Sequence, residues 1–347
     1  MSEIPVLRVI DAAANRAREG LRVAEDFVRF VLDDRHLTDC LKRLRHRLSG
    51  ALARVSLSER LSARETQDDV GTQLSLASEQ SRSDMADLLD ANFARLQESL
   101  RSLEEFAKTF DPGLAAELEQ IRYQSYTLHR AVQITRSAID RLAQARLYVL
   151  IDGQSSSEEL AGRVATLVAC GVHVLQLRDK RLDDRTLLAR ARLVRGLTRQ
   201  SSTLLVVNDR PDLAVLADAD GVHVGQEELS VKDARTIVGP RRLVGVSTHS
   251  IQQARQAILD GADYLGVGPV FPSGTKHFGE FPGLELVRAV AAEIRLPAFA
   301  IGGIDREKLG QVLSAGLRRV AVSGAVAMAP DPAQAVAELL RLLGSES

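Results

Sequence analysis

Residues 204–250 read LLVVNDRPDLAVLADADGVHVGQEELSVKDARTIVGPRRLVGVSTHS. Three short aliphatic and β-branched runs stand out in this stretch, at 204–208, 221–224 and 243–247, and they alternate with helical segments. Such runs are typical of buried strands, and their alternation with helices is typical of βα units on a parallel sheet. The stretch therefore predicts consecutive βα units.

The same alternation extends over the chain from residue 145 onward and gives eight units. The expected strands cover residues 147–151, 172–177, 204–208, 221–224, 243–247, 264–267, 298–301 and 320–323. Eight units in about 200 residues match the lower end of the size range of (β/α)₈ barrels, whereas a doubly wound sheet more often has five or six strands. We therefore predict an α/β fold, a (β/α)₈ TIM barrel, over residues 145–347.

Residues 1–144 have a different pattern. Only four of the 24 glycines precede residue 145, and apolar residues such as Leu41, Leu44 and Leu48 recur at helical spacing. We predict four long helices, over residues 6–33, 36–56, 81–110 and 113–144, with a polar connection over residues 58–76. The barrel is thus expected to follow an all-α helical domain.

Composition excludes several classes of protein. The 347 residues include 45 Lys and Arg and 46 Asp and Glu, so nothing indicates the positive field that a nucleic-acid or anionic-membrane binder needs. Cys40 and Cys170 form no Cys-x-x-Cys pair, and no apolar run approaches the ~20 residues of a membrane span. We expect a cytoplasmic protein with small-molecule partners, and a homo-oligomer is compatible with the sequence.

The helical half repeats a motif at an offset of 79 residues. Glu19-x-Leu21-Arg22-x-x-Glu25-Asp26-Phe27 reappears as Glu98-x-Leu100-Arg101-x-x-Glu104-Glu105-Phe106. One interpretation is two ordinary amphipathic helices with i,i+3 Arg and Glu pairs. The other is a duplicated helical hairpin whose Glu and Arg side chains converge on a shared site.

Polar residues occupy the carboxyl ends of the predicted strands, where TIM barrels carry their active sites. The second strand ends in Gln176-Leu177-Arg178-Asp179-Lys180. An amide and two cations at one strand end favour an anionic, nitrogen-bearing ligand. The alternative, an exposed charged loop, explains the cations but not the glutamine.

Acidic residues follow the third and fourth strands. Asp209 comes after Asn208, and Glu227 and Glu228 follow the fourth strand. Two carboxylates are a usual provision for Mg²⁺, which leaves its other positions to water and substrate phosphates. Capping of the following helices is an equally good explanation from position alone.

The remaining strand ends predict a second anion site. Gly303 and Gly324, after the seventh and eighth strands, would let backbone N–H groups approach a phosphate, although turn formation alone also explains glycine there. Ser247 ends the fifth strand, and the long connection over residues 268–283 carries Ser273-x-Thr275-Lys276. A pocket with two anion sites suits the joining of a diphosphate to a monophosphate.

Residues 146–343 closely resemble the thiamine-phosphate synthase family, also called thiamine-phosphate pyrophosphorylase. The matching motifs are QLRDK at 176–180, VNDRPDLA at 207–214, ADGVHVGQEEL at 219–229, GVSTHS at 245–250, DYLGVGPVFPSGTK at 263–276, AIGGI at 300–304 and AVSG at 321–324. The resemblance implies a Mg²⁺-dependent transferase of (β/α)₈ fold. It would couple hydroxymethylpyrimidine diphosphate to thiazole phosphate, in plain or carboxylated form, and release pyrophosphate and thiamine phosphate.

The resemblance also implies roles for the matching residues. The pyrimidine diphosphate would contact Gln176, Leu177, Arg178, Asp179, Lys180, Asn208, Ser247 and Lys276. The thiazole phosphate would contact Ser273, Thr275, Gly303, Ser323 and Gly324. Asp209 and Glu228 would bind Mg²⁺, although the family usually has Asp at the second position, one methylene shorter. Lys180, Ser247 and Lys276 are the expected catalytic residues.

The implied chemistry requires no covalent nucleophile. The electron-rich aminopyrimidine stabilises a benzyl-like cation, so the protein has mainly to neutralise the departing pyrophosphate and to hold the thiazole nitrogen in line. The related thiazole tautomerase is the competing interpretation, since it needs neither diphosphate nor Mg²⁺. The presence of Lys180, Asn208-Asp209 and the Ser-x-Thr-Lys segment favours the synthase.

The helical half resembles a second family, an alternative hydroxymethylpyrimidine-phosphate kinase of non-ribokinase type. The resemblance rests on NRAREGLRVAEDF at 15–27, RETQDDVGT at 64–72 and SLRSLEEFAK at 99–108, and no P-loop is present in residues 1–145. A dimerisation or regulatory role is the alternative. The candidate ligand-facing residues are Asn15, Arg16, Arg18, Glu19, Arg22, Arg64, Asp69 and Gly71.

Overall fold

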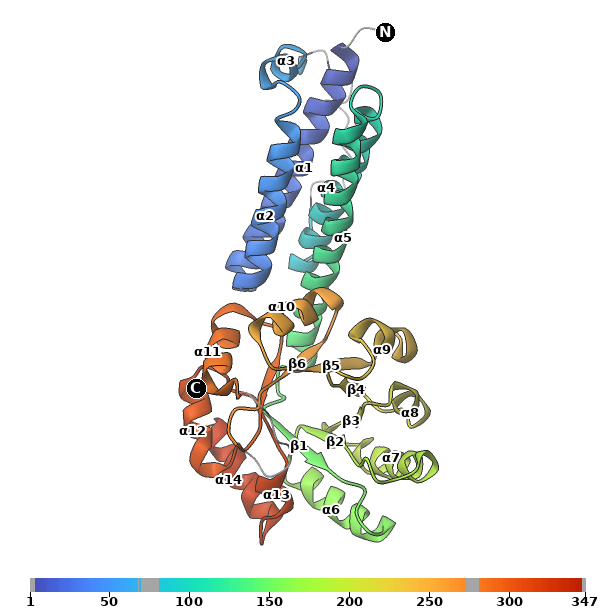
Figure 1. Cartoon of the computed structure of the whole chain (residues 1–347), viewed down its shortest axis with the longest axis vertical. Coiled ribbons are helices and arrows are strands. Elements are labelled where there is room, and N and C mark those ends of the chain that lie inside the picture. Colours follow the sequence, from blue (N-terminus) through green and yellow to red (C-terminus); the bar gives the residue numbers. More distant parts are fainter. Residues whose placement is uncertain (1–3, 68, 70–80, 273–280, 345–347) are drawn as a thin grey trace. The chain divides into compact units, whose positions relative to one another are not determined.

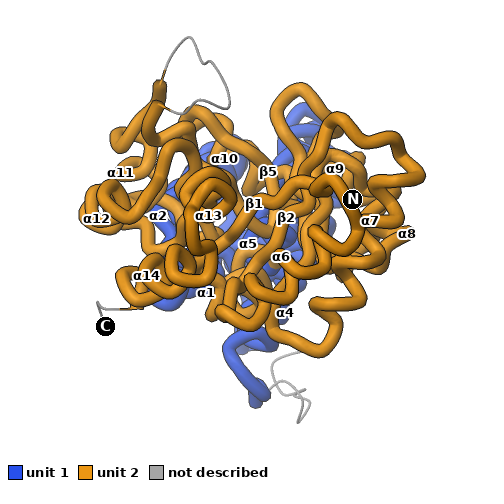
Figure 2. The backbone as a smooth tube through the Cα atoms, turned by 90° about the horizontal axis from the view of Figure 1, so that it is seen from below, with its two compact units in different colours: residues 1–133 blue, residues 134–347 orange. Residues whose placement is uncertain are grey.

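The computed structural model describes residues 4–67, 69, 81–272 and 281–344, and the chain divides into two compact units. Unit 1 covers residues 1–133 and unit 2 covers residues 134–347 (Figure 2). The division falls inside a continuous helix, α5 (Pro112–Arg141), whereas the sequence pattern changes at residues 144 and 145. The change of pattern marks the end of this helix, because the first strand begins shortly after it, at Leu147.

Unit 1 contains the predicted long helices. They are α1 (Ile4–Phe30), α2 (Arg35–Leu52), α4 (Met85–Ala107) and the first part of α5 (Figure 1). Leu41, Leu44 and Leu48 of α2 are buried, as their spacing predicts. The predicted polar connection contains a short helix, α3 (Leu57–Ser62), which the sequence analysis missed because six residues are too few to show a helical period.

Two local features explain how these helices end and pack. α5 begins with Pro112 in its first turn, and Asp111 accepts a hydrogen bond from the N–H of Leu114 at 3.0 Å, so the break predicted between the last two helices is confirmed. α1 packs closely on α4 at Gly20. A Cβ at this position would lie 2.7 Å from the backbone oxygen of Asn92, so only glycine allows this approach.

Unit 2 is a closed barrel of eight parallel strands, so the predicted fold is confirmed. Each strand pairs with the next, and β1 closes the barrel against β8. The strands are β1 (Leu147–Ile151), β2 (Val174–Leu177), β3 (Leu204–Asn208), β4 (Gly221–Val224), β5 (Leu243–Thr248), β6 (Tyr264–Val267), β7 (Ala298–Ile301) and β8 (Val320–Val322). β2 starts two residues later than predicted, and β8 ends before Ser323, which begins the next helix.

Helices surround this barrel (Figure 1). They are α6 (Ser157–Ala169), α7 (Asp184–Thr198), α8 (Pro211–Leu216), α9 (Val231–Val238), α10 (Ile251–Asp260), α11 (Gly283–Glu293), α12 (Arg306–Ser314), α13 (Gly324–Ala327) and α14 (Pro332–Gly344). Three rings fill much of the barrel interior. The ring of Phe299 meets those of Tyr148 and Tyr264 edge to face, at centroid distances of 5.3 and 5.7 Å.

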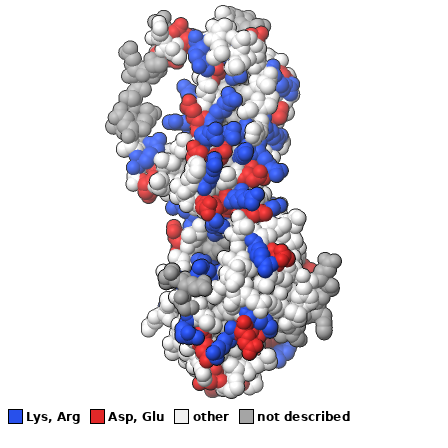
Figure 3. Space-filling view, turned by 90° about the vertical axis from the view of Figure 1, so that its left-hand side faces the viewer, with Lys and Arg blue, Asp and Glu red and all other residues white. Residues whose placement is uncertain are grey.

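The charges of the surface agree with the near-zero net charge. Lys and Arg are interspersed with Asp and Glu on the face that Figure 3 shows. None of the helices that the structure describes has the length and apolar character needed to cross a membrane.

Candidate functional site

Three of the predicted site residues meet beyond the carboxyl ends of β3 and β4. The Nζ atom of Lys180 lies 3.1 Å from Oδ2 of Asp209 and 3.2 Å from Oε1 of Glu228. Asp209 has a φ of 60°, which is unusual for a residue other than glycine, and its N–H donates to the carbonyl of His223 at 2.7 Å. A strained backbone conformation persists only where the surrounding structure holds it, and such conformations are found most often at functional sites.

The capping explanation for these carboxylates is not supported. The helix after Asp209, α8, has no side-chain cap, and α9 is capped by Ser230, whose hydroxyl accepts from the N–H of Asp233. Asp209 and Glu228 instead face Lys180, so their carboxylates converge on one point. Two convergent carboxylates beside a basic group fit the ligands that Mg²⁺ takes in sites completed by substrate phosphates. Among the described residues, no group of three or more His, Cys, Asp or Glu side chains is placed to hold a metal.

A cavity of about 680 Å³ opens at this cluster. Its polar lining includes Lys180, Asn208, Asp209 and Glu228, and Leu177 contributes apolar surface. The volume lies within the range of small-molecule sites, which combine a mostly apolar wall with a few convergent polar groups. Asp179 also lines this cavity, so the structure brings five of the predicted polar site residues around it.

Arg178 lines a different cavity, of about 370 Å³. Ser323 and the guanidinium-bearing Arg163 of α6 share this cavity with it. Arg178 was expected to contact the pyrimidine diphosphate together with Lys180, and Arg163 was not among the predicted residues. In a regular strand, residues two positions apart point to the same side. Arg178 and Lys180 come after the end of β2, where this rule no longer holds, so their side chains can enter different cavities.

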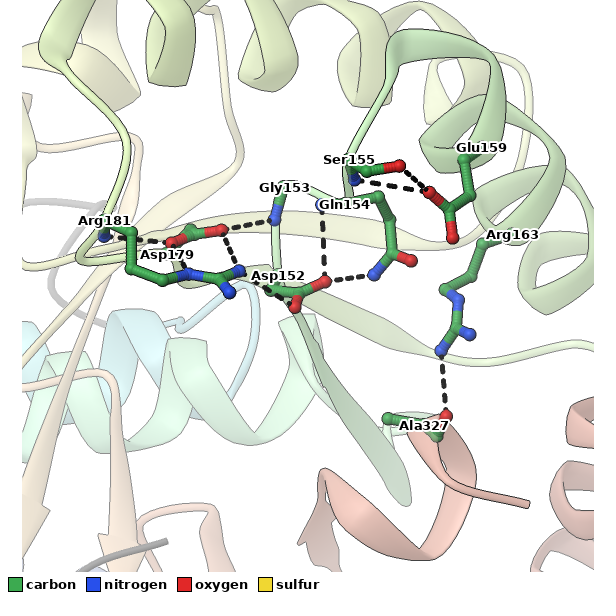
Figure 4. Close-up of polar contacts among 9 residues, drawn as sticks. All are labelled: Asp152, Gly153, Gln154, Ser155, Glu159, Arg163, Asp179, Arg181 and Ala327. Atoms are coloured by element: carbon green, nitrogen blue, oxygen red, sulfur yellow. Dashed lines mark hydrogen bonds and ion pairs between the residues drawn. The ribbon is translucent and has the colours of Figure 1, made fainter.

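Asp179, between these two cations, is held inside the protein (Figure 4). Its side chain is 1% exposed and accepts hydrogen bonds from Nη2 of Arg181 at 2.8 Å and from the N–H of Gly153 at 3.2 Å. The Arg181 guanidinium, together with these backbone donors, lowers the pKa of Asp179 to about 2. A Cβ at Gly153 would overlap the terminal methyl group of Leu182, a flexible side chain that would have to move. The carboxylate therefore joins the end of β2 to the loop after β1.

Gly303 of the predicted phosphate site occupies a tight turn, whereas Gly324 is the first residue of α13. Gly303 has a φ of 61°, and a Cβ there would lie 2.5 Å from the carbonyl oxygen of Pro272. Turn geometry alone therefore requires glycine at this position. Ser323 is the N-cap residue of α13, without a capping bond from its hydroxyl. Ser273, Thr275 and Lys276, like Gly71 in the first half, lie outside the described residues.

The side chains of Gln176 and Ser247 point into the barrel, where other polar side chains surround them. Gln176 is 3% exposed, and its side chain lowers the pKa of the Tyr148 hydroxyl, against the larger opposite effect of burial. The Oγ of Ser247 lies 3.0 Å from Nε2 of His223. Burial lowers the pKa of His223 to about 4, so this imidazole is neutral at physiological pH. The sequence analysis did not single out Tyr148 or His223, because each occupies an ordinary strand position.

A separate cluster joins the helical candidates in unit 1. Arg64 donates two hydrogen bonds to the buried carboxylate of Asp11, at 2.7 and 3.0 Å, and Asn15 donates one at 3.4 Å. Arg60 of α3 is 5% exposed, and its Nε has no hydrogen-bond partner within the described part of the chain. Burial lowers the pKa of Arg60, and the charges of Arg18 and Arg64 act in the same direction. Asp11 and Arg60 were not among the predicted residues.

Arg22 belongs to a different ion pair, and three further helical candidates lie at the surface. Arg16, Glu19 and Asp69 are exposed, and Nη1 of Arg22 lies 3.5 Å from Oε1 of Glu25. Glu25 also accepts from Arg45 of α2 at 2.7 Å.

Both repeats of the sequence motif place their second glutamate in a buried ion-pair cluster. Glu104 pairs with Arg101 of its own helix at 2.8 Å and with Arg122 of α5 at 2.9 Å, as Glu25 pairs with Arg22 and Arg45. The predicted i,i+3 pairs are therefore present in both copies. Each glutamate has its own set of cations, which supports a duplicated hairpin but not one shared site.

Comparisons with known proteins agree with both halves. Residues 147–326 match the family model for thiamine monophosphate synthase, and residues 8–131 match the model of the ThiD2 family. The thiamine-phosphate synthase of Rhodopirellula baltica is 46% identical over 93% of this chain and 88% of its own length. The chain belongs to the thiamine monophosphate synthase family.

Further members of the family align over nearly the whole chain. The thiamine-phosphate synthase of Synechocystis is 42% identical over 99% of this chain and 97% of its own. Among solved structures, the thiamine phosphate pyrophosphorylase of Pyrococcus furiosus is 33% identical with a TM-score of 0.52, and it covers 58% of this chain and 96% of its own. The predicted family, barrel fold and transferase class are thereby confirmed.

Proposed function

We propose that unit 2 joins a pyrimidine methyl diphosphate to a thiazole phosphate at the mouth of the barrel. The observation that carries the proposal is the convergence of Lys180, Asp209 and Glu228 on the 680 Å³ cavity. A second, smaller cavity lined by Arg178 and Ser323 offers a separate place for an anionic group. Two substrates that both carry phosphate require two such places.

Asp209 and Glu228 are the residues that would hold Mg²⁺, with substrate phosphate oxygens completing the shell. When bound, Mg²⁺ supplies positive charge to the diphosphate leaving group. Lys180 is the protein's own cation at the same point, and it balances the two carboxylates. The longer side chain of Glu228 already reaches Lys180, so the departure from the family's usual Asp does not remove this carboxylate from the site.

The proposed reaction breaks the bond between the pyrimidine methylene carbon and the diphosphate oxygen. The bonding electron pair leaves with pyrophosphate, and the lone pair of the thiazole nitrogen forms the new carbon–nitrogen bond. The protein's contribution is to hold the two substrates in line and to stabilise the charge that develops on the leaving group. Lys180 and Ser247 are the described residues proposed to contact the diphosphate, and Asn208 the pyrimidine ring.

Replacement of both carboxylates tests this assignment. We expect Asp209→Asn with Glu228→Gln to lower Mg²⁺-dependent pyrophosphate release by at least about 100-fold, since charge stabilisation at a leaving group is a large term. Glu285→Gln is the matched control, because Glu285 is 86% exposed and pairs only with its own helix through Arg288. Unchanged Mg²⁺-dependent turnover in the double variant would sink the proposal.

For unit 1 we propose a second activity, phosphorylation of a pyrimidine phosphate to the diphosphate that unit 2 uses. Arg64 pairs with the carboxylate of Asp11, and the charges of Asp11, Arg18 and Arg64 all act on Arg60. Arg60 is buried, and its Nε has no hydrogen-bond partner among the residues that the structure describes. A cluster with this excess of positive charge favours a phosphate-bearing ligand. The alternative is a scaffold without catalysis.

The test uses the full chain with the barrel inactivated by Asp209→Asn and Glu228→Gln, so that diphosphate accumulates. ATP, Mg²⁺ and hydroxymethylpyrimidine phosphate are added, and the diphosphate is measured. We expect product with intact unit 1 and a loss of at least about tenfold with Arg64→Ala, which removes one charge-assisted contact. If neither the protein with intact unit 1 nor its Arg64→Ala variant forms or binds the diphosphate, the result would favour a scaffold role of unit 1 without catalysis.

A further inference from the structure

A continuous chain of hydrogen bonds crosses the barrel interior. The Oγ of Ser247 lies 3.0 Å from Nε2 of His223, whose Nδ1 lies 3.3 Å from the hydroxyl of Tyr264. The hydroxyls of Tyr264 and Tyr148 are 3.1 Å apart, and Gln176 lies on the strand that pairs with that of Tyr148, where its amide acts as a donor toward the Tyr148 hydroxyl and lowers its pKa. The chain therefore links five strands, from β5 through β4, β6 and β1 to β2.

Such a chain is unusual at this position. The interior of a (β/α)₈ barrel is normally filled by layers of branched aliphatic side chains, and buried polar groups are costly unless each keeps a partner. Tyr148 and Tyr264 are 3% and 2% exposed. Strand glycines make room for the rings: a Cβ at Gly245 would overlap the ring of Tyr264, and one at Gly266 would lie 3.2 Å from Cε1 of His223.

The direction of the hydrogen bonds follows from the chemistry of the groups. A neutral imidazole has one donor nitrogen and one acceptor nitrogen, so the proton on one side fixes the role of the other. If Tyr264 donates to Nδ1, then Nε2–H donates to Ser247, and the Ser247 hydroxyl proton is free to donate elsewhere. In the opposite direction, the Ser247 hydroxyl would donate its proton to Nε2 of His223. The Ser247 oxygen would then present only its lone pairs to an anion.

The same direction continues to the other end of the chain. Tyr148 then donates to Tyr264 and accepts an N–H of the Gln176 amide, which leaves the Gln176 carbonyl oxygen as an acceptor. One end thus presents a donor, suited to a diphosphate oxygen, and the other end presents an acceptor, suited to an amino group. A diphosphate that carries an aminopyrimidine offers both complementary groups.

We propose that His223, Tyr264 and Tyr148 are positioning residues that orient the Ser247 hydroxyl and the Gln176 amide toward the pyrimidine diphosphate. The inference rests on the proposed contacts of Ser247 and Gln176 with that substrate. Tyr264 is the central link, because its hydroxyl alone joins His223 to Tyr148.

A double-mutant cycle with Tyr264→Phe and Ser247→Ala tests the role in the full-length enzyme. Pyrophosphate release gives kcat/KM for the pyrimidine diphosphate and KM for the thiazole phosphate. We expect Tyr264→Phe alone to lower that kcat/KM about two- to tenfold, the effect of one hydrogen bond, and to leave the KM for thiazole phosphate unchanged. In the Ser247→Ala background, the same substitution should have a smaller effect, because only the route through Tyr148 and Gln176 then remains.

Several outcomes would overturn the inference. Equal losses from Tyr264→Phe with and without Ser247 would mean that Tyr264 acts independently of it, and no loss in the wild-type background would exclude a positioning role. If Ser247→Ala alone left kcat/KM unchanged, the proposed contact of Ser247 with the diphosphate would be wrong, and this result is distinguishable from failure of the positioning role of Tyr264. Tyr148→Phe combined with Gln176→Ala repeats the cycle at the other end, should Tyr264→Phe fail to fold. Tyr123→Phe, in unit 1, is the matched control for loss of a tyrosine hydroxyl.

Discussion

At the residue scale, neighbouring residues of the segment 176–180 have different surroundings. Arg178 and Lys180 line separate cavities, while Asp179 between them bonds Arg181 and Gly153. The sequence analysis grouped all five residues as substrate-binding, because a motif shows which residues are adjacent but not which way each side chain turns. Asp179 lines the same cavity as Lys180, and its bonds to Arg181 and Gly153 hold the backbone between the two cations.

Asp179→Asn tests this role of the carboxylate. The amide cannot accept all the hydrogen bonds that the carboxylate accepts, so the end of β2 should shift relative to the loop after β1. We expect kcat/KM for pyrophosphate release to fall about 10- to 100-fold, since displacement of a positioning group by about 1 Å has effects of this size. Wild-type kcat/KM in this variant would show that the two cations are held by other contacts.

The same residue predicts a pH dependence of stability. Its pKa is lowered to about 2 in the folded protein, so its contribution to the free energy of unfolding is complete above about pH 4 and disappears as the pH falls through 2. Urea unfolding of wild type and Asp179→Asn should therefore differ by about 1–3 kcal/mol at pH 7 and converge toward pH 2. Asp152→Asn, which removes the half-exposed partner of Arg181, should change the free energy of unfolding by less than about 1 kcal/mol at any pH.

At the scale of elements, the positions of the strands could be predicted but their neighbours across the barrel could not. Alternation of apolar runs with helices is a local signal, and it identified all eight strands. Contacts such as that of Asp11 with Arg64, 53 residues apart, arise only when helices pack. The glycines of β5 and β6 carry no local signal for the rings that they accommodate, because those rings belong to other strands.

Gly245→Ala tests the fit of β5 around Tyr264. The added methyl group would overlap the tyrosine ring, which is enclosed by Phe299 and Tyr148 and cannot move freely. We expect a loss of about 1–3 kcal/mol in the free energy of unfolding, typical of an overpacked core. Gly196→Ala is the control, since a Cβ there meets nothing within 4 Å and Gly196 lies within a helix. Equal stability of the two variants would contradict the packing argument.

The repeated helical motif leads to a prediction for α4. Glu104 is 2% exposed and pairs at 2.9 Å with Arg122, itself 9% exposed, so Glu104→Gln leaves this buried guanidinium with the more exposed carboxylate of Glu119, at 4.0 Å. We expect a loss of about 3–5 kcal/mol in the free energy of unfolding of unit 1, followed by helix circular dichroism in urea. The neighbouring Glu105→Gln removes a 46% exposed carboxylate and should cost less than about 1 kcal/mol. Similar losses in the two variants would show that burial of Glu104 has no energetic weight.

At the scale of the whole molecule, a net charge of −1 is compatible with strongly anionic substrates because the cations are concentrated. Lys180 and Arg178 serve the barrel, and Arg18, Arg60 and Arg64 form a second group in unit 1. Each group lies within one compact unit. Ligands for the two groups should therefore stabilise the two units separately.

Hydrogen exchange of the full chain tests this separation. Pyrophosphate with Mg²⁺ should slow exchange at the ends of β2, β3 and β4 and leave α1 and α4 unchanged, because a ligand stabilises only the state that binds it, by about 2.7 kcal/mol at 100 times its Kd. Hydroxymethylpyrimidine phosphate should protect α1 and α3 instead, and Arg64→Ala should abolish that protection without altering the response of the barrel. Protection of both units by either ligand alone would contradict the expectation that each ligand stabilises only the unit that binds it.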